Sequence, residues 1–64
     1  MTRNPFTVVE TLRAVMSMPG AKDMRVGQVI VNAVSIAFPH YNGDVFYIED
    51  EAMIQALQQY MSRL

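Results

Sequence analysis

The residues best suited to recognise a ligand lie close together in the middle of the chain. Four polar residues interrupt an otherwise apolar stretch at spacings of three or four: Arg25, Gln28, Asn32 and Ser35. On a helix these spacings bring the side chains within roughly 80° of one another, so they form one polar stripe. An arginine beside the free N–H groups of a helix start can bind a phosphate, and two amides four residues apart can contact the edge of a base. Tyr47, further along the chain, can supply a ring that stacks on that base.

Three interpretations of this stripe stay open. The four side chains can simply face water, with Gly27 easing close packing of the helix. They can belong to a protein–protein contact. They can also form a nucleotide-type ligand site, for which the candidate residues are Arg25, Gln28, Asn32 and Tyr47.

Residues for catalysis and metal binding are sparse. His40 is the one histidine, it lies in a predicted loop, and the chain has no cysteine. The late carboxylates lack the spacing of a calcium loop: they are Asp44, Glu49, Asp50 and Glu51. A turn residue and a helix start, where negative charge is favourable, account for this group. We therefore expect no enzymatic activity, no metal site and no cofactor.

Composition limits what the chain can build. It has 64 residues, of which 52% are apolar and 17% charged, and its formal net charge is −1. A chain of this size buries only about 60% of its unfolded surface, so we expect one small domain over residues 1–64. The net charge does not favour general binding to nucleic acid. No stretch is typical of a signal peptide or long enough for a membrane span, which favours a cytoplasmic protein.

The charge is unevenly distributed along the chain. Residues 1–38 carry four basic and two acidic groups, whereas residues 39–64 carry one basic and four acidic groups. Halves of opposite sign suit intramolecular or head-to-tail packing.

Hydrophobic periodicity predicts an all-α fold of three helices. The first, over residues 5–17, begins after a capping Asn4 and ends before Pro19. Its apolar face is expected to comprise Val8, Val9, Leu12, Val15 and Met16. The last helix is expected over residues 50–63, preceded by a short extended segment at 45–48.

The middle stretch predicts a helix over residues 24–38 that is apolar around most of its circumference. Such a helix must be buried on several sides, and two other helices of one chain offer too little cover. We therefore expect a homo-oligomer with this helix in the interface. A strand over residues 29–31 is the alternative, because β-branched residues favour sheets. That strand would be apolar on both faces, which a two-stranded hairpin in so short a chain does not bury.

Two segments resemble a pattern found in short, mostly uncharacterised proteins of bacteriophages and prophages. Residues 25–32 read Arg-Val-Gly-Gln-Val-Ile-Val-Asn, and residues 44–50 read Asp-Val-Phe-Tyr-Ile-Glu-Asp. The similar proteins carry Arg-x-Gly-Gln, an apolar pair and x-Asn, then Asp-x-Phe/Tyr-Tyr-apolar-x-Asp before a final amphipathic helix. The likeness covers about residues 25–60. It implies a phage setting inside a host cell, where many small proteins inhibit or sequester components of host defence.

These observations together predict a non-enzymatic, phage-type binding protein that counteracts host defence. Its expected partners are other copies of itself and either a host defence protein or a nucleotide signal held between subunits. We expect no membrane partner. A small helical DNA-binding regulator is the alternative, but the acidic C-terminal half and the absence of a basic recognition helix argue against nucleic acid as a partner.

Overall fold

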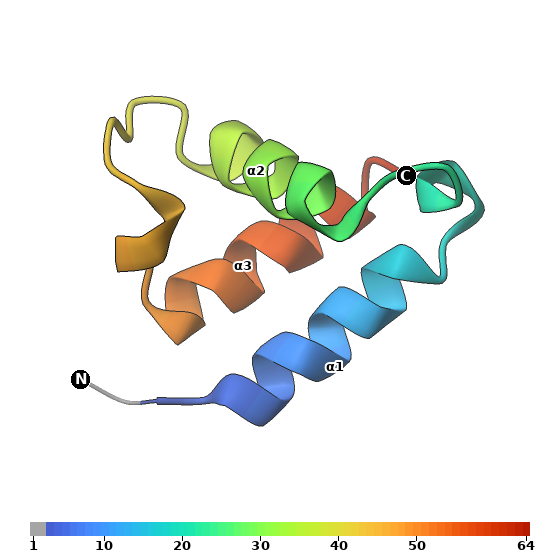
Figure 1. Cartoon of the computed structure of the whole chain (residues 1–64), viewed down its shortest axis with the longest axis horizontal. Coiled ribbons are helices and arrows are strands. Elements are labelled where there is room, and N and C mark those ends of the chain that lie inside the picture. Colours follow the sequence, from blue (N-terminus) through green and yellow to red (C-terminus); the bar gives the residue numbers. More distant parts are fainter. Residues whose placement is uncertain (1–2) are drawn as a thin grey trace.

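The computed structural model describes residues 3–64, which form three α-helices joined by two connections (Figure 1). The helices are α1 (Pro5–Met16), α2 (Val26–Ala37) and α3 (Asp50–Met61). A short 3-10 turn lies in each connection, η1 (Pro19–Ala21) and η2 (Val45–Tyr47). The all-α fold predicted from the sequence is confirmed, with each helix ending within two residues of its expected limits.

α3 is the helix that holds the other two together. It lies between α1 and α2, and the two main helix–helix interfaces are α1 with α3 and α2 with α3 (Figure 1). The Cα radius of gyration is 11.0 Å, close to the roughly 11 Å expected for a compact chain of this length. The last helix of the sequence therefore completes the core for both earlier helices.

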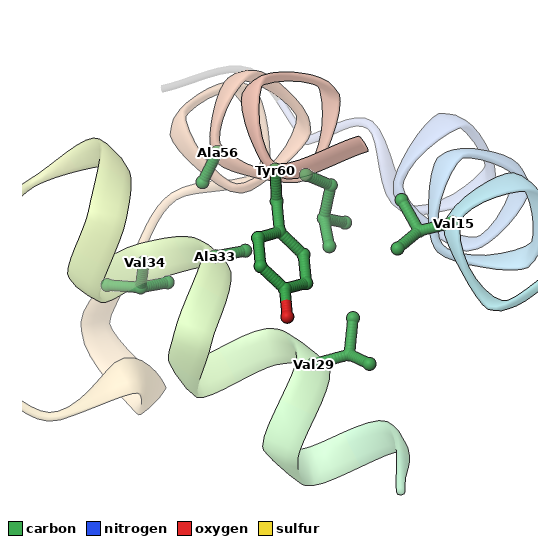
Figure 2. Close-up of a cluster of buried hydrophobic side chains, with 7 residues drawn as sticks. Val15, Val29, Ala33, Val34, Ala56 and Tyr60 are labelled. Carbon is green, nitrogen blue, oxygen red and sulfur yellow. The ribbon is translucent and has the colours of Figure 1, made fainter. Parts of the chain in front are cut away.

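Apart from Tyr60, the core is built from small and medium-sized side chains. It joins Val15 of α1 to residues of α2 and α3 (Figure 2): Val29, Ala33, Val34, Ala56, Leu57 and Tyr60. The largest fully buried side chains are Leu57, Val15 and Val29. The Tyr60 ring extends from α3 toward α2, where Ala33 and Val29 lie (Figure 2). Alanines at the α2–α3 contact let the two helices approach closely, because interaxial distance depends on side-chain size.

The segment at 45–48, expected to be extended, is a turn instead. The Tyr47 backbone N–H donates to the Asp44 carbonyl at 3.0 Å, and the Ile48 N–H donates to the Val45 carbonyl at 3.0 Å. A lone extended segment has no such local partners for its backbone groups, whereas a 3-10 turn satisfies them within four residues. The extended segment predicted at 45–48 is therefore wrong over Val45–Tyr47, because extended backbone without a pairing strand leaves its N–H and C=O groups without partners.

One residue of the predicted α1 core face lies outside it. Val15 is buried and Val8, Leu12 and Met16 pack against the core, but Val9 is 61% exposed. Consecutive helical residues lie about 100° apart, so Val8 and Val9 cannot both face one neighbouring helix squarely. Because α3 is the main helix packed on α1, Val9 falls outside the contact.

Candidate functional site

The polar stripe of α2 divides into exposed and half-buried residues. Arg25 occupies the N-cap position, and its side chain is exposed, as are those of Gln28 and Ser35. Arg25 and Gln28 therefore lie together at the start of α2, where the backbone N–H groups and the positive end of the helix dipole are available to an anion.

Asn32 is turned toward α3 instead of lying open beside Gln28. Its side-chain amide Nδ2 donates to the Tyr60 hydroxyl at 3.3 Å, and that hydroxyl donates to the Met24 sulfur at 3.5 Å. Tyr60 is only 7% exposed, so its oxygen needs a partner inside the protein. This contact gives Asn32 a structural role in joining α2 to α3.

Tyr47 lies far from the arginine that it was expected to assist. It belongs to η2, beyond the C-terminal end of α2, and it is 74% exposed. Arg25 precedes the N-terminal end of the same helix, and η2 lies toward the opposite end (Figure 1). A helix of 12 residues is about 18 Å long, so one chain places these two residues at opposite ends of α2. Within one chain, the candidate ligand residues Arg25 and Gln28 are together and Tyr47 is apart.

The loop before η2 is held by its own tyrosine. The Tyr41 hydroxyl donates to the Asp44 carbonyl at 2.7 Å, and the ring passes close over Gly43. A Cβ added at Gly43 would overlap with the Tyr41 hydroxyl. A larger residue at Gly43 would therefore push the exposed Tyr41 ring aside and break its hydrogen bond to the Asp44 carbonyl.

The acidic residues at the start of α3 bind the start of α1. The Asn4 backbone N–H donates to Asp50 Oδ2 at 2.7 Å, and Asn4 Nδ2 donates to Glu51 Oε1 at 3.4 Å. Asn4 is the N-cap residue of α1, but it forms no side-chain cap bond with the described part of that helix. These two carboxylates thus fasten the two helix starts to each other. Among residues 3–64, no group of three or more potential ligands is placed to hold a metal ion.

An exposed apolar ridge runs along α1. Phe6 is 85% exposed and Val9 is 61% exposed, and they lie one turn apart. Arg13, also exposed, continues the same side one turn further on. We call Phe6, Val9 and Arg13 the α1 ridge. The α1 ridge was not predicted from the sequence, because Val9 was assigned to the core. The spacing of Phe6, Val9 and Arg13, three and four residues apart, is the signal that places them on one side of a helix.

The outward face of α2 carries a second, smaller apolar surface. Val31 is 52% exposed and Val26 is 48% exposed, so α2 is better covered than its composition suggested. Gly27 is exposed on the same side, and apart from its chain neighbours and its own helix backbone no described atom lies within 4 Å of the position that its Cβ would take. Gly27 therefore does not ease packing within one chain.

Comparison with protein-family models, with curated proteins and with solved structures finds no match to this chain. In the described part of the chain, no helix has both the length and the apolar character needed to cross a membrane.

Proposed function

We propose that this protein is a non-enzymatic binding protein that docks the α1 ridge onto another protein. The exposure of Phe6 carries this proposal. The largest fully buried side chains are Leu57, Val15 and Val29, yet Phe6, which is larger than each of them, is 85% exposed. Burying such a side chain contributes about 1.5–3 kcal/mol, so a chain with a small core forgoes a substantial gain by leaving it in water.

The composition of the α1 ridge suits a protein partner. Single exposed apolar residues are common on protein surfaces and need no explanation. Here an aromatic residue and a valine share one side of a helix with an exposed arginine. Aromatic residues and arginine are enriched at protein interfaces and among the residues that contribute most to binding. Phe6 is therefore the expected anchor, with Arg13 at the rim of the contact.

The resemblance of residues 25–32 and 44–50 to phage and prophage proteins supports the choice of target. We propose that the partner is a component of host defence inside the infected cell, and that binding inhibits it. The protein acts as a homo-oligomer in this proposal, with the half-exposed Val26 and Val31 of α2 at the contact between copies.

A nucleotide signal bound between subunits is the second candidate. The exposed pair Arg25 and Gln28 at the start of α2 favours it, because together they offer a phosphate contact and an amide. Asn32 donates a hydrogen bond to the Tyr60 hydroxyl, and Tyr47 lies at the other end of α2. One chain therefore does not bring all four candidate ligand residues together.

Plaque formation on hosts that each carry one defence system tests both candidates. The variants are Phe6→Glu, Arg25→Ala and a matched control, Thr7→Glu, which adds the same charge at the neighbouring exposed position of α1. The wild type and Thr7→Glu should restore plaque formation on at least one host, and Phe6→Glu should restore it at least tenfold less. Retained function in Phe6→Glu together with loss in Arg25→Ala would favour the nucleotide candidate. If the wild type restores plaques on none of the hosts, the anti-defence role is wrong.

A further inference from the structure

One helix face has a feature that a single chain does not explain. Gly27 stands in the first turn of α2 with an ordinary negative φ, and apart from its chain neighbours and the backbone of its own helix no described atom lies within 4 Å of its would-be Cβ. A glycine in a helix loses more backbone entropy on folding than an alanine would. Neither the backbone conformation nor a close contact among the described residues requires glycine here, and the open position leaves room for a close contact from outside the chain.

The residues beyond Gly27 give its face a symmetrical order. Val31, 52% exposed, lies one turn after Gly27, and the exposed Ser35 lies one turn after Val31. The face therefore runs small, branched apolar, small, at equal intervals of four residues. A two-fold rotation about an axis beside Val31 exchanges the two small residues and leaves this order unchanged. The i±4 ridges of one copy can therefore pack into the grooves of the other. Self-complementarity of this kind is what a two-fold symmetric interface requires.

The charges on α2 favour the antiparallel arrangement of two copies. The segment Val26–Ala37 contains no charged residue, so two of these faces do not repel each other. Arg25 is exposed at one end of the helix, and the last turn at the other end carries no basic residue. In an antiparallel pair, Arg25 of each copy lies beside the carbonyl end of the facing helix, where a cation is favourable. A parallel pair would place the two arginines side by side.

We propose that two copies of this protein pair through their α2 faces, antiparallel, with the two-fold axis passing beside Val31. Gly27 of one copy then lies opposite Ser35 of the other, and the missing side chain at Gly27 lets the helices approach. The pairing rests on the homo-oligomeric state proposed above and specifies its surface. It leaves the α1 ridge, on a different helix, open to the target.

Disulfide trapping tests this geometry directly, because the chain has no cysteine of its own. Val31→Cys should cross-link two copies, since both sulfurs lie next to the axis. Gly27→Cys should not cross-link to itself: in the antiparallel pair these positions are eight residues apart along the axis, or about 12 Å, beyond the roughly 7 Å that a disulfide spans between Cα atoms. A mixture of Gly27→Cys and Ser35→Cys chains should cross-link as a heterodimer. Glu10→Cys, exposed on α1, is the control that should stay uncross-linked.

A steric variant gives an independent measure. Gly27→Leu should fold with unchanged helicity, because the position is open in a single chain. It should raise the dimer dissociation constant by about a hundredfold or more, since overpacked contacts occur twice in a symmetric pair. Ala14→Leu, at an exposed position of α1, is the matched control and should leave the dissociation constant unchanged.

The outcomes separate this inference from the proposed function. Cross-linking of Gly27→Cys to itself shows parallel pairing and overturns the inference. If the wild type has twice the 7.3 kDa mass of one chain but Val31→Cys does not cross-link, the copies meet through another surface, so the inference fails and the homo-oligomer stands. A mass of 7.3 kDa at every micromolar concentration contradicts both.

Discussion

The helices α1 and α2 both pack on α3, but the more apolar helix is the better covered one. α2 exposes Val26 and Val31 only by about half, whereas α1 leaves Phe6 85% and Val9 61% exposed. Residues that flank α2 on both sides also pack against the core, including Met24, Phe38 and Ile48. At the start of α1, Asn4 reaches α3 through hydrogen bonds to the carboxylates of Asp50 and Glu51.

The hydrophobic periodicity of a helix and the burial of its apolar faces by the rest of the chain are therefore separate properties. The sequence pattern shows that a helix has apolar residues on several sides, but not how many of those sides the rest of the chain reaches. In the described residues, the first helix, whose pattern predicted a single apolar face, has Phe6 and Val9 exposed outside that face's contact with α3.

The substitution with the greatest expected loss of stability lies in α3, the helix on which both α1 and α2 pack. Leu57→Ala should lower the free energy of unfolding by about 2–5 kcal/mol, because it removes a fully buried side chain and leaves a cavity. Thermal and urea unfolding followed by circular dichroism measure this loss. If α1 unfolded while α2 stayed helical, the two helices would not share one core built on α3.

The next effect separates Asn32 from its neighbours in the polar stripe. Asn32→Ala should cost about 1 kcal/mol in urea unfolding, because it removes the partner that donates to the nearly buried Tyr60 hydroxyl. Arg25→Ala, at an exposed position, should change stability by about 0.5 kcal/mol or less. If both variants lost equally little free energy of unfolding, the hydrogen bond to Tyr60 would not be important for stability, and Asn32 would again be a candidate ligand residue.

A substitution on the outward face of α2 is expected to raise the free energy of unfolding. Gly27→Ala should stabilise the isolated chain by about 0.5–1 kcal/mol, since alanine is the better helix former and the site is open. The measurement is urea unfolding at a protein concentration low enough to keep the chain monomeric. A destabilised Gly27→Ala monomer would mean that glycine has a role within one chain, which removes the reason for assigning it to a contact between copies.

The smallest expected effect concerns the α1 ridge. Phe6→Ala should change the free energy of unfolding by only about 0.5 kcal/mol or less, as is usual for exposed positions. Val15→Ala on the buried face of the same helix should cost clearly more, since Val15 is fully buried. Comparable losses for Phe6→Ala and Val15→Ala would show that Phe6 is part of the core in solution.

Much of the fold could be predicted from local signals. Helical periodicity located all three helices, and the failure of alternation at residues 29–31 correctly excluded a strand there. The turn at η2 and the exposure of Val9 could not be predicted in the same way, because both depend on what lies beside the segment and not on its own residues.

The candidate site was harder to predict than the fold. Spacing predicted that Arg25 and Gln28 lie near each other, and both are exposed at the start of α2. Spacing could not show that Asn32 faces the Tyr60 hydroxyl, which lies 28 residues later, or that η2 falls at the far end of α2 from Arg25. Those facts follow from the packing of α3 across both earlier helices.

Native mass spectrometry of the protein, isolated gently from infected or defence-active cells, tests whether the α1 ridge and the outward face of α2 are binding surfaces. We expect a species heavier than twice 7.3 kDa, made of paired chains with a host protein bound, and no such host protein on the Phe6→Glu variant. A bare 7.3 kDa chain that unfolds cooperatively on heating would contradict it.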